Sequence, residues 1–214
     1  MEVSVVIPNF NGIAFLDSVL ASLEGQTLNN FEVILVDNGS TDGSCSFVTA
    51  NYPWVHLIEL SENFGFCGAV NAGIRAAKAP YVLLLNNDTE VKEDFVEEML
   101  AAIRRHKNAF SCGARMVQYH DRDKLDDVGN YYCALGWSFA RGRGKDIHAY
   151  ETEDRIFSAC AGAAIYRKKI LEKIGYFDEE HFAYLEDTDI GYRARIYGYE
   201  TVSYTHLRAH ETDS

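Results

Sequence analysis

The chain has 214 residues, of which 47% are hydrophobic, and this is enough to fill the core of one sizeable α/β domain. It carries 32 acidic and 20 basic residues, a net charge of -12, which argues against nucleic acid as a partner because its phosphate backbone would be repelled. The five cysteines are scattered without a C-x-x-C pair, so they predict buried thiols in a reducing compartment.

The amino terminus reads MEVSVVIPNFNG. Its apolar run is too short to span a bilayer, and it lacks the basic start of a signal peptide. We therefore expect a cytoplasmic protein without a transmembrane segment. Peripheral contact with the inner face of the membrane stays open, and the oligomeric state is not specified by the sequence.

The first half of the chain alternates strand and helix patterns. Apolar, β-branched runs predict four buried strands, and helical spacing of apolar or small residues predicts four helices. The strands are expected at 3–7, 31–36, 55–60 and 81–85, and the helices at 16–23, 41–52, 68–77 and 94–106. Continuous apolar strands separated by helices are typical of a parallel sheet covered on both faces.

The second half is less regular. Residues 109–150 mix charged, glycine and aromatic residues and predict irregular strands and mobile loops. Order returns with a strand expected at 156–166, a helix at 167–174 that ends at Gly175, and a last helix at about 187–197.

Two features of the irregular segment have alternative interpretations. Trp137 is either a platform for a sugar ring or a core aromatic. The basic residues Arg141, Arg143 and Lys145 either face an acceptor phosphate or belong to a solvated loop.

Polar residues follow each predicted strand of the first half. The stretches are PNFN at 8–11, DNGS at 37–40, SEN at 61–63 and NND at 86–88. Ligands bind outside the carboxyl ends of the strands in sheets of this kind. Any one of these asparagines has about even odds of being an ordinary loop residue. Their coincidence predicts a ligand site at this edge.

Two common phosphate-binding motifs are missing from the sequence. PNFNG follows the first strand in place of G-x-G-x-x-G, and no G-x-x-x-x-G-K-[ST] occurs. Gly65, Gly68 and Gly73 are better explained by close packing of a helix than by phosphate contact. Hydride transfer and P-loop hydrolysis are therefore disfavoured.

A diphosphate held through a metal ion remains. Mg²⁺ typically takes one or two protein carboxylates together with phosphate oxygens and waters, so Asp88 at a strand tip suffices. Asp37, also at a strand end, has a carboxylate that can accept hydrogen bonds from a base N–H.

Several motifs in a set order carry a resemblance to a known family. They are VVIPNFNG, EVILVDNGSTDGS, ENFGFCGAVNAGIRAA, YVLLLNNDTEV and CAGAAIYRKKILEKIGYFDEEHFAYLEDTDIGYRAR. Together these motifs, which cover roughly residues 3 to 200, resemble the family 2 glycosyltransferases of the GT-A fold. More narrowly, they resemble the rhamnosyltransferase-like branch. The resemblance implies a Rossmann-like, mostly parallel sheet with helices on both faces.

The resemblance also implies a donor site. It places Asp88 as the ligand of a divalent metal, Mn²⁺ or Mg²⁺, within the Asp-x-Asp motif whose first acidic residue is Asn86 here. The residues implied in donor nucleotide binding are Pro8, Asn9, Asn11, Asp37, Asn38, Asn63, Gly65, Phe66, Asn71 and Asn87.

The acidic pair Glu186-Asp187 matches the family's catalytic pair. The resemblance implies that Asp187 is the catalytic base and that Glu186, Gly162 and Ala163 belong to the acceptor side. At the start of a helix, Asp187 is expected to be kept ionised by the helix dipole and to be a weak base. The alternative is that acidic residues here only cap the helix, as expected for Asp189.

The expected function is inverting transfer of a sugar from a nucleotide-diphosphate sugar, with dTDP-rhamnose as one candidate donor. The acceptor would be a hydroxyl of a saccharide or lipid-linked molecule in cell-surface polysaccharide synthesis. One alternative is a sugar-nucleotide nucleotidyltransferase, although the glycine-rich arginine loop expected for a triphosphate is missing. Another is a truncated domain that binds nucleotide without turnover.

The carboxyl terminus departs from the family pattern. We expect a glycosyltransferase domain over 1–201, with a nucleotide-binding half at 1–107 and an acceptor-binding half at 108–201, truncated at its carboxyl end. Residues 202–214 are expected to be a non-native tail. The family's histidine that completes the metal site is not matched by His206 or His210.

Overall fold

The computed structural model describes residues 1–211, with side chains described as far as Tyr204. The strands are β1 (Val3–Asn9), β2 (Phe31–Asp37), β3 (His56–Glu59), β4 (Tyr81–Leu85), β5 (Thr89–Val91), β6 (Ala109–Gln118), β7 (Leu125–Asp127), β8 (Asn130–Tyr132), β9 (Ser138–Ala140), β10 (Asp154–Ile156), β11 (Ala163–Arg167) and β12 (Glu200–Glu211). The helices are α1 (Ile13–Glu24), α2 (Ser44–Asn51), α3 (Gly65–Ala76), α4 (Phe95–Arg105), α5 (Lys168–Ile174) and α6 (Glu186–Ile196), with a 3₁₀ turn η1 (Glu179–His181). All eight elements predicted for the first half are present, with ends within three residues of the predicted ones.

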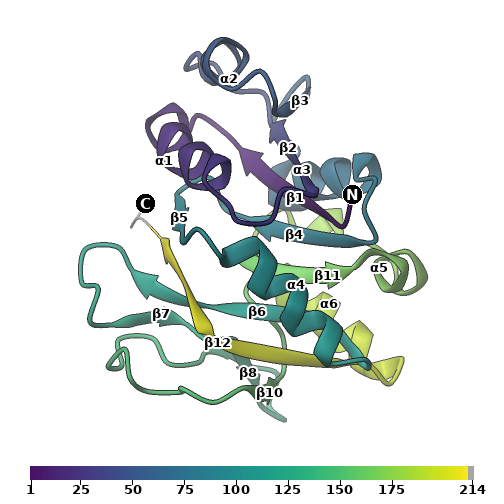
Figure 1. The fold of residues 1–214 in the computed structure, drawn as a ribbon. Coiled ribbons are helices and arrows are strands. Elements are labelled where there is room, and N and C mark those ends of the chain that lie inside the picture. The colour runs from purple at the N-terminus through teal and green to yellow at the C-terminus, as the bar shows by residue number, and fades with distance from the viewer. Residues whose placement is uncertain (212–214) are drawn as a thin grey trace.

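A single large sheet crosses the molecule in the order β10-β12-β6-β11-β4-β1-β2-β3 (Figure 1). β1 pairs in parallel with β2 and β4, and β2 pairs in parallel with β3. β11 is antiparallel to both β4 and β6, so β6 and its parallel partner β12 run in the same direction as β4. The predicted mostly parallel sheet is confirmed, and it joins residues of both predicted halves.

Helices cover both faces of this sheet (Figure 1). On one face, α1 and α4 bury side chains such as Leu20 and Met99. On the other face, α3, α5 and α6 bury side chains such as Ile74 and Ile190. Because β1, β2 and β4 run in parallel, the polar stretches that follow them meet at one edge of the sheet.

Strand β6 lies where the sequence predicts an irregular segment. Its residues are buried almost throughout, and these include the polar side chains of Ser111 and Arg115. Because both faces of β6 are covered, no alternation of polar and apolar residues marks it in the sequence. Arg115 is accommodated through its Nη1, which donates to the Ile147 carbonyl at 3.2 Å.

The single strand predicted at 156–166 is wrong, because the chain leaves the sheet after β10 and returns as β11. Between them, the Phe157 N–H donates to the Asn130 carbonyl at 3.0 Å. Ser158 packs so closely on α6 that a Cβ added at Gly191 would meet its Cβ at 2.5 Å. These residues are small or apolar because they lie under α6, and a strand is not needed to explain them.

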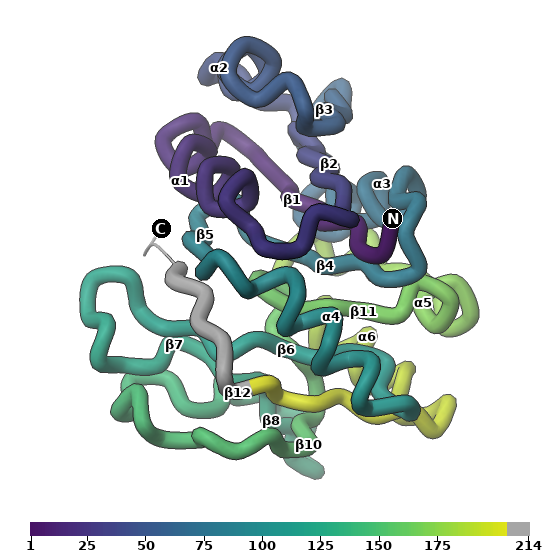
Figure 2. Tube along the Cα trace, in the orientation of Figure 1, coloured from purple at the N-terminus to yellow at the C-terminus, as the bar shows by residue number. Residues whose placement is uncertain are grey.

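Strand β12 follows α6 and runs beside β6 (Figure 2). It continues past residue 201, and Val202, Ser203 and Tyr204 are all buried. The Tyr204 hydroxyl donates to Glu98 Oε2 at 2.5 Å. Residues 202–204 are thus packed in the core. For the rest of the expected tail, the side chains of 205–211, His206 and His210 included, and all of 212–214 lie outside the described residues.

The loops of the second half gather at the end of the sheet opposite α2 and β3 (Figure 2). Arg141 is buried there, with its guanidinium 4.6 Å from the centre of the Tyr150 ring and 2.7 Å from Asp154 Oδ2. Both interpretations of Arg141 are therefore wrong, because it is a structural residue of this lobe. Arg143 and Lys145 are exposed, as in a solvated loop.

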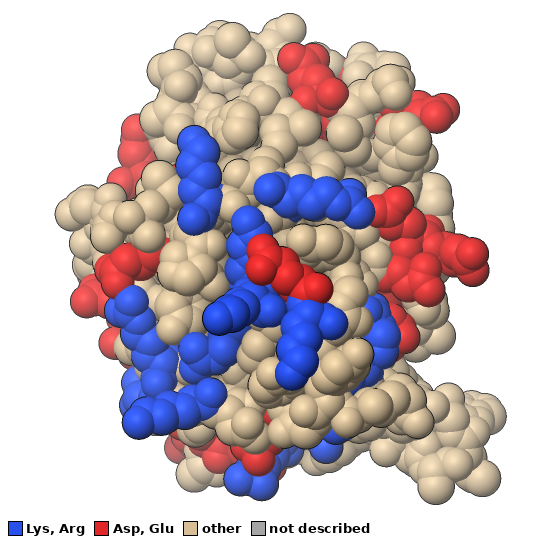
Figure 3. Space-filling model, turned by 90° about the vertical axis from the view of Figure 1, so that its right-hand side faces the viewer, with Lys and Arg blue, Asp and Glu red and all other residues tan. Residues whose placement is uncertain are grey.

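Basic side chains gather on one face of the acidic molecule (Figure 3). Helices α3, α4 and α6 are followed by β4, β6 and β12, which all run in the same direction. The carboxyl ends of these helices therefore lie at the edge of the sheet where those strands begin. Cations there complement the helix dipoles. The basic residues in the last turns of α3, α4, α5 and α6 are Arg75, Arg104, Arg105, Lys173, Arg193 and Arg195.

Candidate active site

The loops after β1, β2, β3 and β4 enclose a pocket of about 450 Å³, called the strand-end pocket below. The second half of the chain adds Phe182 and Tyr184 to its wall, a contribution that the sequence does not predict. Nine of the residues predicted for the donor and the metal line it, namely Pro8, Asn9, Asn11, Asn38, Asn63, Gly65, Phe66, Asn87 and Asp88.

Asparagine side chains in the strand-end pocket hold one another in place. Asn87 Nδ2 donates to Asn9 Oδ1 at 2.7 Å, and Asn9 Nδ2 donates to Asp37 Oδ2 at 2.9 Å. On the opposite side, Asn38 Nδ2 donates to Asn63 Oδ1 at 2.9 Å. These bonds link loops that are far apart in the sequence, so the pocket presents fixed amide donors and acceptors to a ligand.

Two predicted donor residues, Asp37 and Asn71, lie outside the pocket lining. Asp37 is 2% exposed, and its carboxylate accepts hydrogen bonds from Asn9 Nδ2 and from the Ser40 N–H. Asn71 is 1% exposed, and its amide both donates to and accepts from the backbone of Phe177. Both residues position the loops beneath the pocket.

Gly65 joins the two halves of the chain at the strand-end pocket. Its φ of 75° is in the left-handed region that favours glycine. A Cβ added there would meet the Phe182 carbonyl oxygen at 2.5 Å. The same oxygen accepts a hydrogen bond from the Cys67 N–H at 3.2 Å. Glycine is therefore needed where the loop before α6 rests on the first turn of α3.

Asp88 lies at the tip of β4 in the strand-end pocket and is 9% exposed. Burial, with a smaller contribution from Asp126, raises the pKa of its carboxyl to about 6. Within the described residues, no group of three His, Cys, Asp or Glu side chains is arranged to hold a metal ion. A carboxylate at a strand tip in the pocket lining fits a divalent ion that takes most of its ligands from a bound diphosphate.

Asp187 lies in the first turn of α6, at the root of the β8–β9 hairpin. Its Oδ2 accepts a hydrogen bond from Asn130 Nδ2 at 2.8 Å, and its Oδ1 accepts from the Thr188 N–H at 2.6 Å. Burial raises the pKa of Asp187, although these hydrogen bonds lower it. Because burial outweighs the stabilisation of its charge, Asp187 is a stronger base than its place at a helix start predicts.

Glu186 is buried beside Asp187. Burial, and then the neighbouring Asp187 charge, raise the pKa of Glu186 to about 7. Its Oε2 is buried and has no hydrogen-bond partner among the described residues. Asp189 does not cap the helix as predicted, because its carboxylate accepts instead from Arg193 at 2.6 Å along α6.

Gly162 and Ala163, predicted for the acceptor side, lie beneath the turn that carries Asp88. The Asn86 N–H donates to the Gly162 carbonyl at 2.8 Å. Ala163 is 1% exposed and pairs with Leu85 across β11 and β4. These two residues therefore support the turn that carries Asp88.

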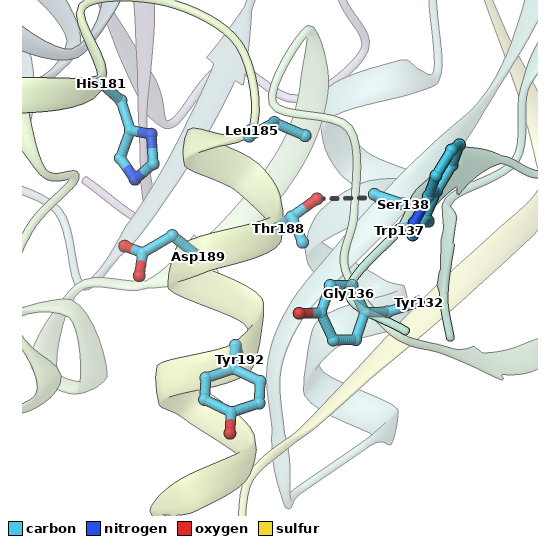
Figure 4. A pocket seen from close by; sticks show the side chains of 9 residues that line it. All are labelled: Tyr132, Gly136, Trp137, Ser138, His181, Leu185, Thr188, Asp189 and Tyr192. Carbon is cyan, nitrogen blue, oxygen red and sulfur yellow. Dashed lines mark hydrogen bonds between the residues drawn. The ribbon is translucent and has the colours of Figure 1, made fainter. Parts of the chain in front are cut away.

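A second hollow of about 540 Å³, called the α6 hollow below, lies between α6 and the β8–β9 hairpin (Figure 4). Asp187 lines neither hollow, but its neighbour Thr188 lines the α6 hollow. The segment before α6 borders both hollows, because Phe182 and Tyr184 line the strand-end pocket while His181 and Leu185 line the α6 hollow. Two adjacent hollows, one with a metal-compatible carboxylate and one beside a basic carboxylate, suit a transfer between two substrates.

A sequence comparison identifies the family of the chain. The profile of glycosyl transferase family 2 matches residues 4–175. The chain belongs to this family. The family assignment agrees with the resemblance carried by the ordered strand-end motifs.

Two curated relatives illustrate the match. An N-acetylglucosaminyl-diphospho-decaprenol L-rhamnosyltransferase of Mycobacterium tuberculosis is 26% identical over 235 residues, which cover 97% of this chain and 76% of the relative. Glycosyltransferase GlyG of Streptococcus pneumoniae is 31% identical over 133 residues, which cover 61% of this chain and 42% of that protein.

Solved structures share the GT-A fold. S. aureus TarS 1-349 in complex with UDP-GlcNAc has a TM-score of 0.74 and 21% identity, and the match covers all of this chain and 59% of that one. GalNAc-T7 with UDP, GalNAc and Mn²⁺ has a TM-score of 0.83 and 15% identity, with 44% of its chain covered. The chain thus spans about half of each of these structures.

Three contributors to the site had no clear signal in the sequence. Asn130 holds the Asp187 carboxylate from 57 residues away, and Phe182 and Tyr184 reach the strand-end pocket from the second half. Only the pairing of β11 between β4 and β6 brings these segments together. In the part of the chain that the structure describes, no helix has the length and apolar character to cross a membrane.

Proposed function

We propose that this glycosyl transferase family 2 chain moves a sugar from a nucleotide-diphosphate sugar to a hydroxyl group of a saccharide or lipid-linked acceptor, with inversion at the anomeric carbon. The observation that carries the proposal is the strand-end pocket, where loops from four strand ends meet around Asp88 and where Phe182 and Tyr184 join the wall from the segment that leads to Asp187. We place the reaction in the synthesis of a cell-surface polysaccharide.

The strand-end pocket would bind the nucleotide through its asparagine amides. Asn38 and Asn63 hold each other by a 2.9 Å hydrogen bond, and Asn9 and Asn87 do so by a 2.7 Å bond. Amides fixed in this way can read the donors and acceptors of a base and a ribose at little cost in side-chain entropy.

Asp187 would act as the general base. An acceptor hydroxyl loses its proton to the Asp187 carboxylate as its oxygen bonds to the anomeric carbon, and the bond from that carbon to the diphosphate breaks on the opposite face. A positioned base contributes roughly 10²–10⁴-fold to such a step. Asn130 and Thr188 orient the carboxylate, and its burial raises the pKa toward the range in which proton transfer is efficient.

Asp88 would hold a divalent ion, Mn²⁺ or Mg²⁺. Such an ion would stabilise the negative charge that grows on the leaving diphosphate. The GalNAc-T7 structure, which contains Mn²⁺ and UDP in the same fold, supports this part of the proposal. Asn86 and Asn87 flank Asp88 in the turn and add no further charge.

The donor and acceptor are proposed from the relatives. An L-rhamnosyltransferase aligns with 97% of the chain, so dTDP-rhamnose is the first donor to test. UDP-GlcNAc, the ligand of the TarS structure, is the second. The mycobacterial name also favours an acceptor attached to a lipid diphosphate.

Two substitutions test the roles of the carboxylates. Asp187→Asn should keep nucleotide binding and lose transfer by about 10²–10⁴-fold, because the amide cannot take the proton. Asp88→Ala should lose the part of nucleotide binding that depends on Mn²⁺. Calorimetry with a nucleoside diphosphate, with and without Mn²⁺, and a transfer assay with the two donors separate these effects.

Glu180→Gln is the matched control, since Glu180 is exposed and lies on η1, in the segment that leads to α6. This variant should bind and transfer like the parent. Equal transfer by Asp187→Asn and the parent would remove Asp187 as the base. Nucleotide binding without any turnover of the parent would leave a binding domain in place of an enzyme.

A further inference from the structure

The α6 hollow has an aromatic wall that is open to solvent. Trp137, at the turn of the β8–β9 hairpin, is 65% exposed and stacks with Phe139 at 6.5 Å between ring centres. Tyr132 on β8 and Tyr192 on α6 lie with ring centres 6.2 Å apart. Of the two interpretations of Trp137, a core position is wrong. Exposed aromatic side chains that are grouped in one hollow are typical of a binding surface.

The polar groups of the hollow lie on its α6 side. Thr188 Oγ1 and Ser138 Oγ are 3.0 Å apart and join α6 to the hairpin (Figure 4). Thr188 Oγ1 is also 3.2 Å from Asp187 Oδ1. Asn130, which holds Asp187, begins the strand that carries Tyr132. The aromatic wall and the proposed base are therefore fixed to each other by one hydrogen-bonded frame.

The charge around the hollow is negative. Among its described lining residues there is no lysine or arginine, and Asp189 contributes a carboxylate that is paired along α6 with Arg193. Glu186 and Asp187 precede the lining residues Thr188 and Asp189 in the first turn of α6. Apart from the imidazole of His181, the described lining offers a carboxylate or phosphate on a ligand no cationic side chain, and the carboxylates of α6 would repel it.

We propose that the α6 hollow binds an uncharged pyranose ring, the sugar unit of the acceptor that carries the reacting hydroxyl. This proposal rests on the proposed function, and it adds the place and the charge of the acceptor. The apolar face of the ring stacks on Trp137 and Tyr192, and its hydroxyls meet Ser138 and Thr188. An acceptor whose last unit is a uronic acid or a polyol phosphate is rejected by the carboxylates of α6.

The chain offers a direct test because it contains only two tryptophans, Trp54 and Trp137. In Trp54→Phe, the fluorescence reports on Trp137 alone. Titration with octyl β-glucopyranoside below its micelle concentration should change this fluorescence in a saturable way. Octyl β-glucuronide, which differs only by its carboxylate, should bind roughly tenfold or more weakly, as expected when a charge is left without a partner.

Trp137→Phe is the matched control for the titration, since it keeps only Trp54, which lines a different hollow with Met1 and Phe31. Its fluorescence should not respond to either glycoside. Equal affinity for the two glycosides, or a response from Trp54 as large as that from Trp137, would overturn the proposal.

Transfer kinetics separate this proposal from the proposed function. Trp137→Ala should raise the KM for a neutral glycoside acceptor about tenfold, the loss of one aromatic stacking contact. Donor hydrolysis and nucleotide affinity should be unchanged, and Trp54→Ala should match the parent. Glycoside binding at Trp137 without any transfer would contradict only the function. If Trp137→Ala and a charge on the acceptor both left transfer unchanged, only the proposal that the α6 hollow binds the acceptor would be contradicted.

Discussion

At the scale of single residues, the candidate site contains carboxyl groups whose ionised form is disfavoured by burial. Asp88, Glu186 and Asp187 all have raised pKa values, and burial is the largest cause in each. Such groups weaken the fold when they carry charge, and they are concentrated where function needs a metal ligand or a base. Glu186 is the clearest case, because its Oε2 has no hydrogen-bond partner within the described chain.

Glu186 makes the stability of the fold depend on pH. Its pKa rises from 4.5 to about 7 on folding, so the folded chain holds the proton more tightly than the unfolded chain does. Stability should therefore fall as pH rises from about 4.5 to 7. Asp187 strengthens this effect and a charged His181 opposes it. Glu186→Gln should remove this contribution and be more stable than the parent at pH 8, by on the order of 3 kcal/mol.

Urea unfolding of parent and variant at pH 5 and pH 8 measures the difference. Asp88 and Asp187 are present in both proteins, so their contributions largely cancel in the comparison. Glu180→Gln, an exposed change of the same type, should leave the dependence on pH as it is. Parallel stability curves for Glu186→Gln and the parent would show that Glu186 titrates normally.

At the scale of elements, helix α3 shows how small residues set the distance between a helix and the sheet. The sequence predicts that the glycines of α3 serve close packing and not phosphate contact. Gly73 supports this prediction most directly, because an added Cβ would meet Val6 Cγ1 at 2.3 Å and Val36 Cγ2 at 3.1 Å. The amino end of the same helix borders the strand-end pocket at Gly65 and Phe66. A shift of α3 away from the sheet would therefore disturb the pocket.

Gly73→Ala should destabilise the fold by about 1–3 kcal/mol, because the methyl group overpacks the contact between α3 and β1. This loss would occur although alanine favours a helix by about 1 kcal/mol over glycine. Gly25→Ala is the control, since its nearest neighbour would be 3.9 Å away at a negative φ. Chemical unfolding of the two variants should give clearly different midpoints, and equal midpoints would refute the tight contact.

At the scale of the whole molecule, one sheet joins a first half that forms most of the strand-end pocket to a second half that contains the proposed base. β11 runs antiparallel between β4 and β6, and β12 completes the sheet beside β6. The basic last turns of the helices lie at the opposite edge from the site (Figure 3). The molecule therefore gathers basic side chains at the edge opposite the site despite a net charge of -12.

Tyr204 tests whether β12 belongs to the native core. Tyr204→Ala should cost about 3–5 kcal/mol, as for other large buried aromatics, because the ring is 3% exposed and its hydroxyl bonds Glu98. Tyr197→Ala, at a tyrosine that is 51% exposed, should cost much less. Urea unfolding compares the two. Similar small losses would mean that residues from Val202 onward add little to the fold, in keeping with the expectation of a non-native tail.

The sequence by itself determined the alternating elements of the first half, because buried parallel strands and amphipathic helices each leave a local pattern. It also determined the strand-end residues, since the carboxyl ends of parallel strands must share an edge. Only the tertiary structure decided the second half. β6 is covered on both faces and shows no alternation, and the residues around Ser158 pack beneath α6.

The same division holds inside the site. Asp88 and Asp187 stand in recognisable motifs, so they could be singled out as candidate site residues from the chain alone. Asn130, Trp137 and Phe182 acquire their places only when the β8–β9 hairpin and the loop before α6 fold onto the sheet. Contacts between residues so far apart in sequence leave no local pattern, because their geometry depends on the sheet order.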